Sequence, residues 1–230
     1  MINKKAAKKI RKTHRYLGLF IGIQFLAWTI SGLYFSWTNL DQIHGDQFRR
    51  KPSKKDLFNN LIVLDSIPLQ IEELNLVSID EQPYFWINEE VLYHAQSGMI
   101  KKQITEGEAL RIAQRNLIEG LRVDHVEFLT TTDSHHEYRG QSLPAYAIHY
   151  DHEDLLVAYV DAKSGVFKKV RHQSWRWFDF LWMGHTMDYQ GRDNFNNYLL
   201  RIFSIFGIFT VLSGFILWAT SSPTLRKWVK

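Results

Sequence analysis

A chain of 230 residues can hold one folded domain of about 100–150 residues together with a small number of membrane segments. It has no cysteine, which excludes disulfides, thiolate metal sites, cysteine nucleophiles and iron–sulfur clusters, and its mean hydropathy of −0.25 excludes a polytopic transporter. The net charge of +4 is unevenly distributed, because the tails 1–15 and 220–230 are basic and carry no acidic residue. This distribution indicates two cytoplasmic tails and argues against a nucleic-acid-binding surface.

The first predicted element is a transmembrane helix over residues 16–37. This run carries no charge, and as a helix it spans about 33 Å, which matches the hydrocarbon core of a bilayer. Cleavage as a signal peptide is the competing interpretation. The apolar core is too long for a signal peptide, and no small-x-small pattern follows it.

Small residues and one histidine recur at steps of three and four along this helix, so we expect them to share one face. They are His14, Gly18, Gly22, Phe25, Thr29, Gly32 and Ser36. The C-terminal apolar run has a similar set, which is Arg201, Ser204, Gly207, Val211 and Gly214. Two interpretations remain open for these stripes: close packing of the helices, and space for a flat tetrapyrrole between them.

After the first span, the polar and basic residues 38–60 are predicted to form a linker, and residues 61–172 a folded domain. Strands are expected at 61–64, 74–79, 84–87, 91–94, 123–130, 145–150, 155–160 and 166–170. Between the two groups of strands, Thr105 and Glu108 form a capping box that starts a helix, and Gly120 ends it. A helix that covers one face of an antiparallel sheet, in an α+β layer, is the predicted arrangement.

The last part of the chain returns to the membrane. Residues 173–197 are aromatic and amphipathic and are predicted to form an interfacial segment. Residues 198–219 form a second transmembrane helix with one charge, Arg201, near its start. Both tails then lie in the cytoplasm, and the domain between the helices lies on the outer side of the inner membrane, in the periplasm.

Several motifs resemble a known family. Thr105–Val170 resembles a PepSY domain, and Tyr84–Lys102 resembles the end of a degenerate earlier copy of it. Thr13–Gly18, Ile30–Leu33, Gly184-His185 and Leu212–Trp218 resemble helix motifs of PepSY-associated transmembrane proteins. The expected fold class is therefore α+β, with two transmembrane helices that flank a periplasmic PepSY-like domain. Larger members of this family include haem-containing ferric-siderophore reductases, from which this chain departs because it has only two spans.

Haem b is the cofactor that this resemblance implies, because imidazole is a good axial ligand for haem iron. His185 on the outer side and His14 at the cytoplasmic edge match family motifs, but they lie on opposite sides of the membrane and cannot bind one iron. His44 is a weaker outer candidate. His14 would need a counterpart from a second subunit, such as His14 of a homodimer. Arg201 is a candidate partner for a haem propionate, with snorkelling to the interface as the alternative.

The other histidines raise the question of a metal site. They are the pair His135 and His136 in a polar loop, and His149 with His152. If 149–152 is a strand, His149 and His152 point to opposite faces. Zinc or copper binding is the alternative to solvated loop histidines, and we assign no metal ligand here. No catalytic residue is assigned either, because the sequence has no nucleophile motif or phosphate loop.

Three functional hypotheses remain open. The first is a haem protein that transfers electrons across the membrane to ferric iron or a ferric siderophore, as a ferric reductase-type component of iron uptake. The second is an anchored module that binds or inhibits a periplasmic protein. The third is an accessory subunit of a larger membrane complex. All three place the chain in a lipid bilayer, and none involves nucleic acid.

Overall fold

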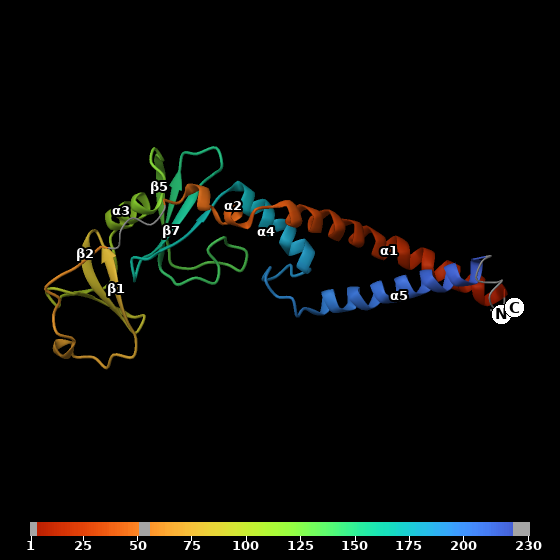
Figure 1. The fold of residues 1–230 in the computed structure, drawn as a ribbon, viewed down its shortest axis with the longest axis horizontal. Coiled ribbons are helices and arrows are strands. Elements are labelled where there is room, and N and C mark those ends of the chain that lie inside the picture. Colours follow the sequence, from red (N-terminus) through yellow and green to blue (C-terminus); the bar gives the residue numbers. More distant parts are fainter. Residues whose placement is uncertain (1–3, 51–55, 223–230) are drawn as a thin grey trace. The chain divides into compact units, whose positions relative to one another are not determined.

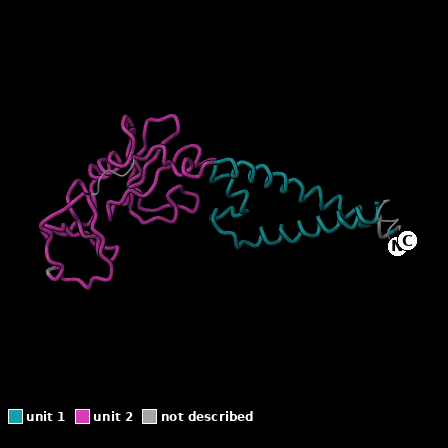
Figure 2. Tube along the Cα trace, viewed as in Figure 1, with its two compact units in different colours: residues 1–38, 178–230 teal, residues 39–177 magenta. Residues whose placement is uncertain are grey.

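The computed structural model describes residues 4–50 and 56–222. The chain forms two compact units, shown in different colours in Figure 2. The helical unit contains the described residues up to Thr38 and from Phe178 onward, and the sheet unit is Asn39–Trp177.

The helical unit is built from α1 (Lys4–Trp37), α5 (Tyr198–Ser221) and the second half of α4 (Gln173–Thr186) (Figure 1). Lys8–Trp37 and Tyr198–Ser221 are long and apolar enough to cross a membrane. Their apolar side chains are mostly on the surface: Phe20, for example, is 76% exposed and Phe209 58% exposed. The core helix of a soluble protein would bury such side chains, whereas lipid leaves them favourably solvated.

The face of α1 that packs in this unit repeats every seven residues. It includes His14, Ile21, Trp28 and Phe35, which contact α5 and α4. A seven-residue repeat follows the seam between two helices. The predicted stripe of small residues advances by more than 3.5 residues per turn, so it drifts away from this seam. Its members Gly22, Phe25, Thr29 and Ser36 are exposed, so most of the stripe lies outside the contacts that α1 makes with α5 and α4.

The sheet unit contains two four-stranded antiparallel meanders. The first is β1 (Leu74–Ile79), β2 (Gln82–Ile87), β3 (Val91–His94) and β4 (Ile100–Lys101), in that order. The second is β5 (Val123–Leu129), β6 (Ala145–Tyr150), β7 (Val157–Asp161) and β8 (Phe167–Arg171), also in chain order. The α+β fold class is confirmed, and two sheets of the same topology agree with the expected repeat of one hairpin unit.

Helix α3 (Glu106–Asn116) lies between the two sheets in the chain and packs on the second sheet. The predicted capping box is present: the Thr105 hydroxyl accepts a hydrogen bond from the Glu108 N–H, and the Glu108 carboxylate accepts one from the Thr105 N–H at 2.7 Å. Burial opposes ionisation of Glu108, but these hydrogen bonds and Lys101 Nζ at 3.0 Å prevail and lower its pKa. The helix ends at Asn116, earlier than predicted, and Gly120 lies in the turn that follows it.

The turn between β7 and β8 joins the two sheets. The Asp161 carboxylate accepts hydrogen bonds from the N–H groups of Lys163 and Ser164, which closes the predicted turn. Gly165 follows with φ of +70°, and a Cβ atom there would lie 2.9 Å from Cγ1 of Ile79 in β1. Glycine therefore permits both the left-handed backbone and the contact between the sheets.

Two predictions about the segment before β1 need correction. Residues 61–64 do not form a strand; Leu64 begins the short helix η2 (Leu64–Ser66). The predicted linker 38–60 is also partly folded, because it contains α2 (Leu40–His44) and η1 (Asp46–Phe48). Ile43 and Phe48 are buried and fix this segment to the sheet unit. The composition of the segment is mostly polar, so it did not predict that these two residues would be buried. The basic cluster at 51–55 lies outside the described residues.

A buried histidine fixes this segment to the sheet. His172 follows β8, is 2% exposed, and its Nε2 lies 3.0 Å from the Gln42 carbonyl oxygen and 3.1 Å from that of Ile43. Gly45, with φ of +86°, brings the end of α2 against Val170. Helix α2 is thus part of the sheet unit.

Candidate functional sites

His185, near the end of α4, packs against α1 through a serine. Its Nδ1 lies 2.8 Å from the Ser31 hydroxyl oxygen. The Ser31 hydroxyl proton is already donated to the Trp28 carbonyl oxygen at 3.1 Å, so the imidazole donates its Nδ1–H to Ser31. In this tautomer Nε2 carries a free lone pair, the form in which histidine binds a metal.

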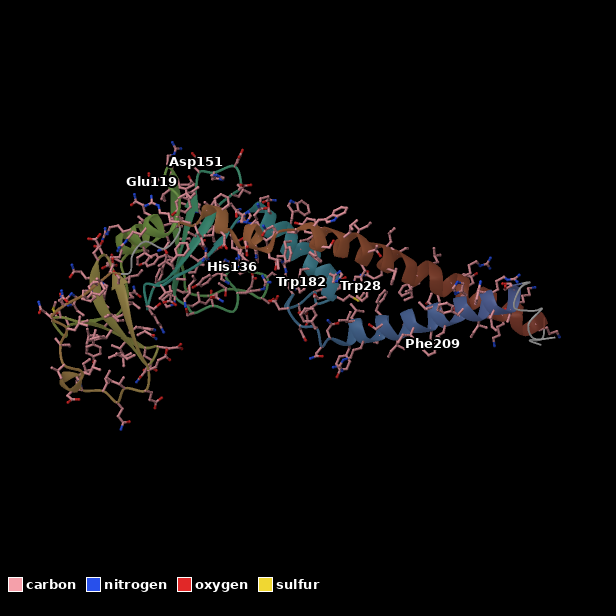
Figure 3. The ribbon with its side chains drawn as sticks, viewed as in Figure 1. Trp28, Glu119, His136, Asp151, Trp182 and Phe209 are labelled. Carbon is pink, nitrogen blue, oxygen red and sulfur yellow. The ribbon has the colours of Figure 1, made fainter. Side chains whose placement is uncertain are left out.

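Aromatic rings surround this imidazole. Trp28 stacks on it at 5.4 Å between ring centroids, Trp182 lies nearly parallel to it at 6.3 Å, and Phe35 meets it edge-on at 5.4 Å. Figure 3 labels the two tryptophans, one on α1 and one on α4. The ring lies beside Gly32, where a Cβ would be 3.8 Å from Cε1 of His185, an ordinary van der Waals contact. The indole of Trp28 also donates a hydrogen bond to the His185 carbonyl oxygen at 2.7 Å, which fixes α4 against α1.

His14 has the same arrangement at the other end of α1. Its Nδ1 lies 2.7 Å from the Ser213 hydroxyl oxygen, and Ser213 donates its proton to the Thr210 carbonyl oxygen. The imidazole therefore donates Nδ1–H to Ser213 and leaves Nε2 with its lone pair. The ring lies over Gly214, where a Cβ would be 3.2 Å from Cε1 of His14.

The two arrangements share a sequence element that the prediction did not use. In each, a histidine from another helix lies against a Ser-Gly dipeptide, and the serine orients its ring; at Gly214, but not at Gly32, a Cβ would crowd the ring. The dipeptides are Ser31-Gly32 and Ser213-Gly214. A serine directly before a glycine in each apolar run was the available signal. The tautomer depends on the hydrogen bond that each serine hydroxyl donates to a carbonyl oxygen of its own helix, and the sequence alone does not show that this bond forms.

The two histidines lie far apart. Ser31 and His14 are 17 positions apart on α1, which corresponds to about 25 Å along the helix axis. One iron cannot be bound by both within a chain, as the sequence analysis expected.

The sequence analysis also named Arg201 and His44, and no hydrogen bond or ring contact between either of them and His185 or His14 is found among the described residues. Arg201 is exposed on the first turn of α5, with its guanidinium 5.8 Å from the centre of the Tyr198 ring. His44 is exposed at the end of α2 in the sheet unit.

A cation that the sequence analysis missed lies closer along the chain to His185. Arg192, in the loop after α4, forms an ion pair with the buried carboxylate of Asp179 on α4. Its Nε is buried and has no hydrogen-bond partner among the described residues. The same loop is held by Asp188, whose carboxylate accepts hydrogen bonds from the N–H groups of Asn194 and Gly191, and these lower its pKa. A single arginine in a polar loop gave no pattern from which to predict this pair.

The sheet unit has a separate cavity of about 800 Å³ beside α3 and the start of β5. Its apolar lining includes Leu110, Leu117 and Leu121, and Tyr150, whose burial raises its pKa to about 12. The arginines at its rim are paired with carboxylates: Arg50 lies 2.7 Å from Glu119, and Arg111 forms a bidentate pair with Asp80. A pocket of this size and lining suits a small or peptide-like ligand.

In the described part of the chain, no three metal-ligating side chains are already grouped around one point. The pair suggested by sequence, His149 and His152, is not formed: His152 Nδ1 accepts a hydrogen bond from the Asp154 N–H, and the ring meets Phe48 edge-on. His149 lies instead against His125 on the neighbouring strand. Burial, together with His125, lowers the pKa of His149.

These features define a class: a membrane protein with two apolar helices and an α+β unit between them in the chain. The family model described as the PepSY-associated TM region matches residues 11–230, and the chain belongs to this family. Comparison with curated proteins gave no match, and comparison with solved structures gave none either.

Proposed function

We propose that this protein binds haem in its helical unit and transfers electrons across the inner membrane. The observation that carries the proposal is that Nδ1 of His185 and of His14 each lies within hydrogen-bond distance of a serine hydroxyl that is already bonded within its own helix, an arrangement that leaves Nε2 with a lone pair. Metal-bound histidines commonly donate the other ring nitrogen in this way, which orients the ring and fixes the tautomer.

The residues around His185 suit a flat macrocycle. The faces of Trp28 and Trp182 lie near the imidazole, and Arg192, which pairs with Asp179 on α4, joins Arg201 as a candidate partner for a haem propionate. Haem bound here would supply one-electron transfer. His185 and His14 would each hold haem through one imidazole, and a second ligand would come from another subunit, either in a homodimer or in a larger membrane complex.

The proposed direction of electron transfer depends on the orientation of the chain in the membrane, which the charged tails indicate. Basic residues before α1 and after α5 favour, by the positive-inside rule, an orientation with both tails in the cytoplasm and the sheet unit in the periplasm. His14 then lies on the cytoplasmic side and His185 on the outer side. The sequence has no flavin or nicotinamide motif, so the electron donor is a separate protein or molecule. Ferric iron or a ferric siderophore at the outer side is the proposed acceptor.

The test is an absorption spectrum of the full chain, produced with ample haem and purified in detergent. We expect the spectrum of a b-type haem, with sharp bands on reduction that indicate two nitrogen ligands. A folded, colourless preparation would contradict the proposal.

The alternative function is a membrane-anchored module that binds a periplasmic protein. The cavity beside α3 favours it, because its apolar floor and paired arginines suit a peptide segment. A pull-down with the full chain and a Leu121→Glu variant distinguishes the two functions. A partner lost only in the variant supports the binding module, and a haem spectrum that is unchanged in the variant assigns the two activities to separate sites.

A further inference from the structure

Two histidines meet on the face of the second sheet that is opposite α3. His125 on β5 and His149 on β6 are directly paired in the strand register. Their rings are 4.1 Å apart between centroids, and the ring planes differ by 9°. Side chains paired across antiparallel strands share one face of the sheet, so both imidazoles point to the same side.

A carboxylate lies on the same face. Glu127 is two residues after His125 on β5 and therefore points the same way. Its Oε2 is 3.8 Å from Nε2 of His149. That nitrogen is buried and has no hydrogen-bond partner among the described residues. A buried polar atom without a partner is costly unless another group satisfies it.

A contact of His125 indicates which of its two ring nitrogens is available to a metal ion. Its Nδ1 lies 2.8 Å from the carboxylate of Asp124, which leaves Nε2 for another ligand. Acidic groups lie around the pair: Asp124 contacts His125, Glu127 lies near His149, and Glu137 also acts on His149 and holds the cation Arg176 at 2.9 Å. This arrangement attracts a positive ion.

We propose that His125, His149 and Glu127 bind a divalent transition-metal ion, such as Zn²⁺ or Cu²⁺. Two imidazole nitrogens and one carboxylate are ligands that these ions accept. Two nitrogens on a tetrahedral zinc ion are about 3.3 Å apart. The two rings, stacked at 4.1 Å between centroids, therefore have to rotate out of their parallel arrangement so that both Nε2 lone pairs point at one ion. The three groups close around the ion only when it binds, and water takes the fourth position.

The remaining histidines of the sheet unit provide controls. His136 Nδ1 accepts a hydrogen bond from the Tyr138 N–H, and His94 Nδ1 from the Ser97 N–H. His135 is exposed in the loop between β5 and β6. Replacing His135 therefore removes an imidazole without touching the proposed site.

The experiment is isothermal titration of the detergent-purified full chain, with its purification tag removed, with ZnCl₂. We expect one saturable site with a micromolar or lower dissociation constant. We expect His125→Ala and His149→Ala to weaken it by about tenfold or more and His135→Ala to leave it unchanged. Cu²⁺ bound to the same site should give an electron paramagnetic resonance spectrum with coupling to two nitrogens.

Circular dichroism separates loss of the site from loss of the fold. His125 is on the surface, with its side chain 58% exposed, so His125→Ala tests the site without opening the core. Zinc binding that is unchanged in the His125→Ala/His149→Ala double variant would overturn the proposal. The absence of any saturable binding to the wild-type chain would also overturn it. Neither result depends on whether the helical unit binds haem.

Discussion

Replacing His185 with alanine is expected to remove haem from the outer level of the helical unit. The imidazole keeps Nε2 available, because Nδ1–H is donated to Ser31, while the Ser31 hydroxyl and the Trp28 indole are committed to hydrogen bonds. The haem-to-protein ratio of the purified variant, measured as the pyridine complex, should be lower than that of the wild type by all of the haem bound at His185.

Ser31→Ala provides the finer test of the same site. It keeps the imidazole but removes the acceptor that holds Nδ1–H, and loss of such a partner lowers metal affinity by about 10–100-fold. His44→Ala is the matched control, since His44 is exposed on the sheet unit. A haem content that is equal in His185→Ala and the wild type would remove His185 from the site. Equal losses in His185→Ala and His44→Ala would instead assign both residues to one site.

Replacing Gly165 with alanine is expected to destabilise the sheet unit by about 2–5 kcal/mol. An alanine there adopts left-handed backbone, at a cost of about 1–2 kcal/mol, and its Cβ overlaps the side chain of Ile79. Ile79 is 1% exposed and packed in the core, so it cannot move aside cheaply, and such overpacking costs about 1–3 kcal/mol. The melting temperature followed by circular dichroism should fall by roughly 8–20 °C.

Gly120→Ala separates the two contributions. Gly120 also has a positive φ, of +84°, but a Cβ there meets no atom within 4 Å. Its replacement should cost only the backbone part, about 1–2 kcal/mol. If the two variants melt at the same temperature, the contact between Gly165 and Ile79 does not join the two sheets.

The sheet unit was predictable from sequence wherever the signal was local. The capping box at Thr105 and Glu108, the turn after Asp161 and strands β1 and β6 depend on neighbouring residues, and all were found. The folded segment before β1 was not, because its two anchors, Ile43 and Phe48, are held by distant residues such as His172. The composition of a segment does not reveal two isolated residues that make contacts of this kind.

The candidate sites follow the same division. His14 and His185 were identified from motifs, but their serine partners lie 199 and 154 positions away and become visible only when the helices pack. Most of the predicted stripe of small residues lies outside the contacts of α1, because the seam between two helices repeats every seven residues. His125 was missed because its position opposite His149 depends on the register of the β5–β6 pair.

The account depends most directly on the two membrane crossings, with both tails on one side and the sheet unit on the other. The absence of cysteine allows single cysteines to be introduced without background. Lys9→Cys lies at an exposed position of the basic tail, and Glu153→Cys at an exposed position of the sheet unit. The cells are treated with a membrane-impermeant maleimide after their outer membrane has been permeabilised. We expect Glu153→Cys to react at once and Lys9→Cys only after the inner membrane is permeabilised as well. Reaction of Lys9→Cys in sealed cells, or protection of Glu153→Cys, would contradict the topology and the functions derived from it.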